Sequence, residues 1–199
     1  MFYDHQIFIS HYGAAFSKIT AAQFQGLDQL LSFVQLGPDI NDDRWVAYML
    51  ATVKLECANT FQPITEFGAP SYFNKYEPDT AKGLELGNTQ SGDGVRFKGR
   101  GYVQITGRVN YARLSTALGL GRSFIDDPVR VLAPINAYRI MSLGMRDGLF
   151  TRRKLEGCIN NNSCDYVAAR KIINGQNKAD EIASYARQFE AALAAARLD

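Results

Sequence analysis

Apolar side chains recur at three- and four-residue intervals along two stretches near the N-terminus, and this period predicts two amphipathic helices. The first helix begins at Thr20, where Gln23 completes a capping box, and ends at Gly37-Pro38. The second helix covers residues 42–57. Its apolar stripe consists of Trp45, Val46, Met49, Leu50 and Val53.

The C-terminal half has the same helical period. It predicts helices from Asn110 to Gly119, from Pro134 to Met145 and from Asn177 to Leu193, with a short helix capped by Ser163. Residues 1–19 carry aromatic and aliphatic side chains without a clear period. We therefore expect an N-terminal arm, residues 1–19, packed on a single domain formed by residues 20–199.

Two segments between these helices lack a helical period. Residues 59–98 contain eight prolines and glycines, which indicates loops and short strands with one helical turn near Tyr72-Phe73. A loop of this length inside a compact domain is usually functional. After Gly101 the residues alternate in polarity, which predicts a short strand with Gln104 and Thr106 on its polar face.

The composition narrows the possible chemistry. The chain has 199 residues, 46% of them hydrophobic, and a net charge of +2, so it predicts one sizeable core and gives no electrostatic case for nucleic acid. Only two histidines occur, both near the N-terminus, which disfavours a histidine metal site or a Ser-His-Asp triad. We expect no metal and no cofactor, which leaves the carboxylates as candidates.

Three cysteines do not form a disulfide framework, although Cys158 and Cys164 flank a short loop and could meet. The N-terminus lacks the pattern of a secretory signal, and no apolar run has transmembrane length. We therefore expect a monomer that is made in the cytoplasm, does not insert into membranes, and reaches any external substrate after release or dedicated export.

Glu56 is the leading catalytic candidate because it falls on or beside the apolar stripe of its helix. Desolvation favours the protonated form of a carboxyl group, and a general acid needs that proton. The alternative is a boundary glutamate that is paired with an arginine.

The residues after this glutamate resemble a known family. A glutamate at a helix end, a long loop and the segment Gly-Arg-Gly-Tyr-Val-Gln-Ile-Thr-Gly-Arg-x-Asn-Tyr at residues 99–111 are similar to the plant-type chitinases, glycoside hydrolase family nineteen. The similarity is greatest to its compact branch of phage and bacterial lysozyme-like enzymes (endolysins). Residues 172–175 are similar to the family's Ile-Asn-Gly segment. The resemblance covers residues 20–193 and implies a mainly α, two-lobed lysozyme-like fold with a small β element beside the active-site cleft.

The family's chemistry is inverting hydrolysis of a glycosidic bond by two carboxyl groups about 6.5–9.5 Å apart. The resemblance implies that Glu56 is the general acid. For the second carboxylate the candidates are Glu66, Glu77, Asp79, Glu85 and Asp93. The compact branch favours Glu66, which we expect in a wetter loop, and the longer plant-type spacing makes Glu77 second. Sugar-binding positions correspond to Gln104, Thr106, Asn110 and Asn174.

The sequence departs from the family at one important place. Where the family has His-Glu-Thr, this chain has Leu55-Glu56-Cys57, so two polar neighbours of the acid are missing. The expected function is a glycosidase that cleaves β-1,4 bonds of bacterial peptidoglycan. The alternatives are a chitinase acting on a chitin-like polysaccharide and an inactive carbohydrate-binding relative. A lytic transglycosylase fits the motif less well.

Overall fold

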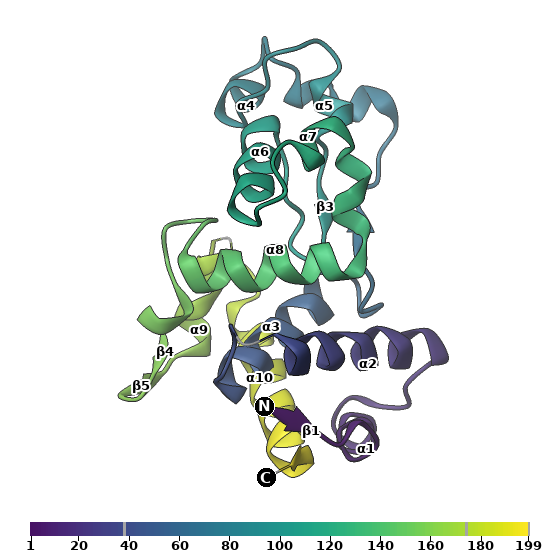
Figure 1. Ribbon diagram of the computed structural model, residues 1–199, viewed down its shortest axis with the longest axis vertical. Helices are drawn as coiled ribbons and strands as arrows, with labels where there is room; N and C mark the ends of the chain where they lie inside the picture. The colour runs from purple at the N-terminus through teal and green to yellow at the C-terminus, as the bar shows by residue number, and fades with distance from the viewer. Residues whose placement is uncertain (38, 174, 199) are drawn as a thin grey trace. The chain divides into compact units, whose positions relative to one another are not determined.

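The computed structural model describes residues 1–37, 39–173 and 175–198. The chain is mainly α-helical, as the sequence predicts, and it forms two compact units: unit 1 consists of Met1–Gln62 and Met141–Asp199, and unit 2 of Pro63–Ile140 (Figure 1). The long helix α8 (Pro134–Asp147) contains the second boundary. None of the helices in the described ranges is long and apolar enough to cross a membrane.

Unit 1 contains the elements β1 (Phe2–Tyr3), α1 (His5–Phe16), α2 (Ala21–Leu36), α3 (Asp43–Glu56), η3 (Leu155–Gly157), β4 (Ile159–Asn160), β5 (Ser163–Cys164), α9 (Tyr166–Ala169), η4 (Arg170–Ile172), α10 (Ala179–Ala196) and β6 (Arg197–Leu198). Unit 2 contains β2 (Ile64–Thr65), η1 (Pro70–Tyr76), α4 (Ala81–Glu85), α5 (Asp93–Arg96), β3 (Arg100–Gly101), α6 (Arg108–Ala117), α7 (Ser123–Asp126) and η2 (Pro128–Leu132). Elements labelled η are 3₁₀ helices.

Helix α3 lies at the centre of unit 1. Nine consecutive residues, from Val46 to Lys54, are buried, so the helix is covered on all sides and not only along the predicted stripe. Helix α10 packs along α3 and also contacts α1 and α9. Because α3 is enclosed in this way, the residues at its C-terminal end are held by a rigid support.

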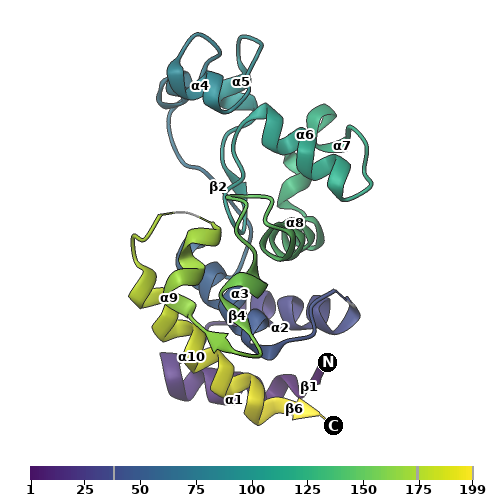
Figure 2. The ribbon, with the colours of Figure 1, turned by 90° about the vertical axis from the view of Figure 1, so that its left-hand side faces the viewer.

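The two chain ends pair in unit 1. Strands β1 and β6 are antiparallel, with Phe2 opposite Leu198 and Tyr3 opposite Arg197, and Figure 2 shows both termini beside this pair. Within residues 1–19, where the sequence shows no clear period, His5–Phe16 form the regular helix α1. Phe8 and Tyr12 of α1 are buried, and both rings lie against Phe189 of α10.

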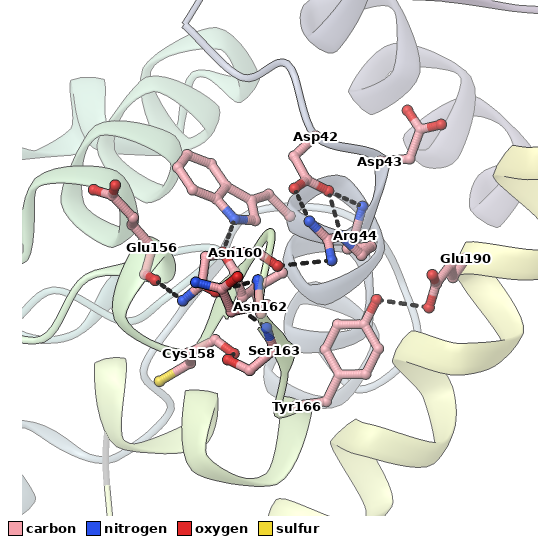
Figure 3. Close-up of polar contacts among 12 residues, drawn as sticks. Asp42, Asp43, Arg44, Glu156, Cys158, Asn160, Asn162, Ser163, Tyr166 and Glu190 are labelled. Carbon is pink, nitrogen blue, oxygen red and sulfur yellow. Dashed lines mark hydrogen bonds and ion pairs between the residues drawn. The ribbon is translucent and has the colours of Figure 1, made fainter.

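A hairpin of β4 and β5 lies beside the first turn of α3 (Figure 3). The indole N–H of Trp45 donates to the carbonyl of Ile159 at 2.9 Å, and Arg44 donates to the carbonyl of Asn160 at 3.0 Å. The predicted helix cap at Ser163 is wrong, because Ser163 belongs to β5 and Asp165 caps α9 instead. Cys57, Cys158 and Cys164 form no disulfide bond with one another.

Unit 2 is built from short helical elements. In residues 59–98 the sequence predicts loops and short strands, and the structure has η1, α4 and α5 there, with only the two residues of β2 in a strand. Helices of four or five residues contain a single turn, so they produce no periodic pattern. The helical turn that was predicted near Tyr72 is confirmed as η1.

The predicted strand over residues 102–106 is also wrong. The strand consists of Arg100 and Gly101, which pair with β2, and the chain then turns back so that Ile105 bridges to Arg100. Gln104 has φ +52°, which a strand does not allow. Tyr102, Val103 and Ile105 are all buried. The alternating polarity therefore belongs to a turn with buried apolar side chains and not to a strand with one apolar and one polar face.

A buried ion pair joins the short elements of unit 2. Asp93 is almost inaccessible and accepts hydrogen bonds from the backbone N–H groups of Thr89 and Gln90 and from the guanidinium of Arg108, at 2.6–3.0 Å. Burial opposes ionisation of this carboxyl, but the hydrogen bonds from Arg108 and from the two amides outweigh it and hold the pKa of Asp93 below its usual value. Asp93 therefore has a structural role in unit 2.

Asp93→Asn should lower the free energy of unfolding by about 3 kcal/mol, because it leaves the Arg108 charge without its partner. The pKa of Asp93 is lower in the folded than in the unfolded state, so its stabilising contribution is complete above about pH 4 and disappears as the pH falls further. Denaturant titrations between pH 2 and pH 7 measure both effects. Between pH 7 and pH 2, Asp93→Asn should lose less free energy of unfolding than the unaltered protein loses. Asp79→Asn is the control, because Asp79 is exposed. Equal effects of the two substitutions would contradict the structural role of the Asp93–Arg108 ion pair.

Candidate active site

Glu56 is the last residue of α3, and its carboxylate forms an ion pair with an arginine that is distant in sequence. A guanidinium nitrogen of Arg170 lies 2.6 Å from Oε1 of Glu56. The Glu56 side chain is 23% exposed and that of Arg170 only 5%. The pairing with an arginine, which the sequence leaves open as the alternative interpretation, is thus present. The ion pair leaves Oε2 without a hydrogen bond from the described residues.

Arg170 is the residue of this site that the sequence analysis missed. It begins η4, 114 positions after Glu56, and its Nε atom donates to the carbonyl of Asn177. The only available signal was an arginine between the apolar residues Ala169 and Ile172, which indicates a buried and therefore paired charge.

The backbone directly after Glu56 is strained. Ala58, Asn59 and Phe61 have φ values of +48°, +62° and +56°, in the left-handed region that residues other than glycine rarely adopt. Three side-chain contacts hold Asn59 in place: its Oδ1 accepts from Lys54 at 2.6 Å and from Tyr12 at 3.1 Å, and its carbonyl accepts from Gln23 at 2.9 Å. Such strain persists only where the surroundings enforce it, and here it determines how the chain leaves Glu56.

A glycine in α2 allows this turn to approach. A Cβ atom added to Gly26 would lie 2.5 Å from the carbonyl oxygen of Phe61 and 2.7 Å from its Cβ. Phe61 itself is fully buried, so it cannot move away. Helix α2, which the capping box at Thr20 predicts, therefore contacts the turn after α3 at Gly26, where the lack of a side chain lets the Phe61 backbone approach.

The Lys54 ammonium group is enclosed by aromatic rings. Its Nζ atom lies 4.5–5.9 Å from four ring centroids, those of Tyr12, Phe16, Phe61 and Tyr185. Burial lowers the pKa of Lys54, because cation–π contacts and one short hydrogen bond replace only part of its hydration. This lysine connects α1 and α10 to the end of α3, two residues before Glu56.

Glu66 lies in unit 2, where several donors hold its carboxylate. Oε1 accepts from the hydroxyl of Tyr76 at 3.0 Å and lies 3.9 Å from the ammonium of Lys75. Oε2 accepts from the backbone N–H of Gly99 at 3.0 Å. The side chain is 19% exposed, so the expectation that Glu66 has a wetter environment than Glu56 is wrong. Hydrogen bonds to both of its oxygens fix the Glu66 carboxylate in place.

Gln104 lies next to this carboxylate. A Cβ atom on Gly99 would be 2.9 Å from Oε1 of Gln104 and 3.1 Å from Oε2 of Glu66, so both side chains close over the same glycine. The amide nitrogen of Gln104 donates to the carbonyls of Ile64 and Gly101, each at 2.9 Å. Its Oε1 accepts no hydrogen bond within the described ranges and can receive one from a ligand.

The other predicted sugar-binding residues that the structure describes form hydrogen bonds to residues close to them in the sequence. Thr106 donates its hydroxyl to the carbonyl of Gln104 at 3.1 Å, and Asn110 donates to the carbonyl of Thr106 at 2.7 Å and accepts from Arg113. Asn174 lies outside the described residues. The assignment of these residues to sugar binding stays a prediction.

The alternative second carboxylates have other positions. Both oxygens of Glu77 accept backbone N–H groups at the start of α5, from Gly92 at 2.8 Å and from Gly94 at 3.0 Å, which makes Glu77 a support for the loop. Asp93 is paired with Arg108, Glu85 forms an exposed pair with Lys82, and Asp79 is exposed. Of the five candidates, Glu66 is the one that combines a fixed carboxylate with a neighbouring amide oxygen at Gln104.

The loop aromatics divide into two groups. Phe61 and Phe73 are buried and belong to the core, and Tyr76 binds Glu66. Phe67 is 97% exposed and Tyr72 is about half exposed. Among the residues that the structure describes, no group of three or more His, Cys, Asp and Glu side chains could hold a metal ion.

The sequence matches no protein-family model and no curated protein. Solved structures do match. Chitinase C from Streptomyces griseus HUT6037 superimposes with a TM-score of 0.64 and 20% identity, over 94% of this chain and 76% of that chain. A mutant of chitinase C gives a TM-score of 0.62 at 20% identity, over 94% and 90%.

This likeness confirms the mainly helical fold that the resemblance to the plant-type chitinases implied. The chain thus has the fold of chitinase C throughout most of its length. At 20% identity the comparison extends to the fold, and the narrower placement in the phage and bacterial lysozyme-like branch stays a prediction.

Gly26→Ala should lower the free energy of unfolding by about 1–3 kcal/mol, because the new methyl group overlaps the backbone of Phe61. Gly13→Ala in α1 is a matched control, since nothing lies within 4 Å of its Cβ position and alanine is the better helix former. Thermal unfolding of both variants measures the difference. The close approach would be refuted if Gly26→Ala were as stable as Gly13→Ala.

Gln104→Ala should destabilise the protein by about 1–3 kcal/mol, because the carbonyls of Ile64 and Gly101 both lose a donor. Gln104→Glu keeps the size of the side chain but removes its N–H donors, so it should be at least as harmful. Urea titration measures both. An unchanged transition midpoint in the two variants would show that the side chain does not hold β2 to the turn.

Proposed function

We propose that this protein is a glycoside hydrolase that cleaves β-1,4 bonds between amino sugars by an inverting mechanism, with Glu56 as general acid and Glu66 as general base. The observation that carries the proposal is the setting of Glu66: a half-buried carboxylate fixed by Tyr76 and Gly99, with the amide oxygen of Gln104 beside it. A base that activates water needs an ionised and immobile carboxylate. The fold shared with chitinase C supports the proposal.

Glu56 has to donate a proton to the leaving glycosidic oxygen. Arg170 occupies Oε1, so the proton would be carried on Oε2. A bound polymer that excludes water favours the neutral form of a carboxyl group, which is the form that a general acid needs. Glu66 would take the proton of the attacking water, as the base of an inverting enzyme does.

The preferred substrate is peptidoglycan. Unit 2, which contains Glu66 and Gln104, has ten lysines and arginines against seven aspartates and glutamates, whereas the remaining residues have twelve against thirteen. An excess of positive charge favours an anionic polymer. The second candidate is chitin, because the structural neighbours are chitinases by name.

An inactive carbohydrate-binding protein is the alternative from another class. Leu55 and Cys57 flank Glu56 with side chains that offer the carboxyl group no strong hydrogen bond. Arg170 supplies a polar partner from another part of the chain, which favours the enzyme. Loss of turbidity of purified peptidoglycan and release of chitin oligosaccharides distinguish the three functions in one pair of assays.

Glu56→Gln should lower turnover by about 100- to 10,000-fold, because it removes the transferable proton. Glu66→Gln should have a loss of similar size, since an amide cannot activate water. Glu56→Gln should also lower the free energy of unfolding by about 1–3 kcal/mol, because Arg170 loses its counter-ion. Replacing a buried carboxyl group that had no partner would instead leave the stability unchanged or raise it. Turnover of peptidoglycan and thermal unfolding are measured together.

Glu77→Gln is the matched control, a glutamate of the same loop that binds only backbone amides. It should lose stability and keep most of its turnover. Full activity of Glu56→Gln would refute the mechanism. Loss of turnover in Glu77→Gln with an active Glu66→Gln would transfer the role of the base to Glu77.

A further inference from the structure

The segment from Glu66 to Tyr76 folds into a compact group of charged and aromatic side chains. The ring of Tyr72 lies against the backbone of Gly68, where an added Cβ atom would be 2.7 Å from the ring. The hydroxyl group of Tyr76 donates a hydrogen bond to the carboxylate of Glu66. Phe67 follows Glu66 directly, and its side chain is almost entirely exposed. The phenyl ring is therefore accessible to a ligand that binds at this segment.

Lys75 lies within this group. Its ammonium nitrogen is 3.4 Å from the ring centroid of Tyr72, 4.7 Å from that of Tyr76 and 3.9 Å from Oε1 of Glu66. Hydrogen bonding to Tyr72 raises the pKa of Lys75, so the lysine is charged at neutral pH. Because Glu66 is at the limit of ion-pair distance and also binds Tyr76 and Gly99, it neutralises this charge only in part.

A second lysine adds to the positive charge. The ammonium of Lys98 lies 4.9 Å from the ring centroid of Phe73, which in turn contacts the rings of Tyr72 and Tyr76. No carboxylate of residues 1–37, 39–173 and 175–198 lies within ion-pair distance of Lys98. Two ammonium groups therefore accompany one carboxylate on this aromatic cluster.

We propose that Phe67 and Lys75 form a subsite next to Glu66 for an amino sugar that carries a carboxylate. The phenyl ring would stack on the apolar C–H face of the sugar, and the ammonium would bind the carboxylate. This inference rests on the proposed function and names the substrate class of that site: a glycan whose amino sugars carry carboxylates on their substituents, as the stem peptides and the peptide-free lactyl groups of peptidoglycan do, in preference to neutral chitin.

The experiment compares kcat/KM of the full-length protein on soluble peptidoglycan strands with kcat/KM on the neutral hexamer of N-acetylglucosamine. Lys75→Gln should lower the ratio of the two values by about two- to fivefold, the contribution of a partly exposed ion pair. Lys75→Arg keeps the charge and should keep the ratio. The ratio separates specificity from any change in Glu66, which affects both substrates alike.

Matched controls come from the same unit. Lys82→Gln removes an exposed lysine that pairs with Glu85 and should leave the ratio unchanged. Phe67→Ala should raise KM severalfold for both substrates, and Leu84→Ala, which removes another exposed apolar side chain, should not. Raising the salt concentration should lower the ratio of the unaltered protein and have little effect on that of Lys75→Gln.

An unchanged ratio in Lys75→Gln, or an equal fall in Lys75→Arg, would overturn the subsite. If the unaltered protein cleaves neither glycan, the proposed function fails, and the subsite is decided by binding of the same two glycans to the same variants. Lys75-dependent preference for the peptidoglycan strands would then support it, and equal binding by Lys75→Gln would overturn it.

Discussion

The buried ammonium of Lys54 is the constraint on which the arrangement of unit 1 depends. The charge loses most of its hydration and regains the rings of four aromatic side chains and hydrogen bonds to Asn59 at 2.6 Å and to the Tyr12 hydroxyl at 3.2 Å. Such a group is a poor source of stability, as the lowered pKa indicates. It does, however, hold the left-handed Asn59, and with it the turn that follows Glu56. The aromatic residues of α1 and α10 are therefore part of the support for the candidate acid.

The two candidate catalytic carboxylates differ in the kind of contact that holds them, although they are almost equally exposed. Glu56 has one strong partner, the guanidinium of Arg170, and Glu66 has a hydroxyl, a backbone amide and a more distant ammonium. Oε2 of Glu56 has no donor within the described ranges, whereas both oxygens of Glu66 accept a hydrogen bond. The two carboxylates thus differ in their hydrogen bonding and not in their burial.

Four residues of the segment that carries the family resemblance have a clear structural role. Gly99 lacks a side chain because Glu66 and Gln104 close over it, and Gly101 has φ +91°. Arg100 is buried and donates to the carbonyl of Arg96 and to the hydroxyl of Tyr111. Gln104 then joins the turn to β2. The motif therefore builds the surroundings of Glu66.

The sequence by itself determined the long helices and the mainly α class, because apolar periodicity and capping are local properties, and it singled out Glu56 as a candidate. It misassigned the strand after Gly101 and the short helices of unit 2, since a left-handed residue and single turns leave no periodic signal. Only the tertiary structure decided that Arg170 pairs with Glu56, that Asp93 belongs to Arg108 and that Glu77 supports α5. Each of these depends on side chains far apart in the chain, and spacing along the sequence contains no information about which charges meet.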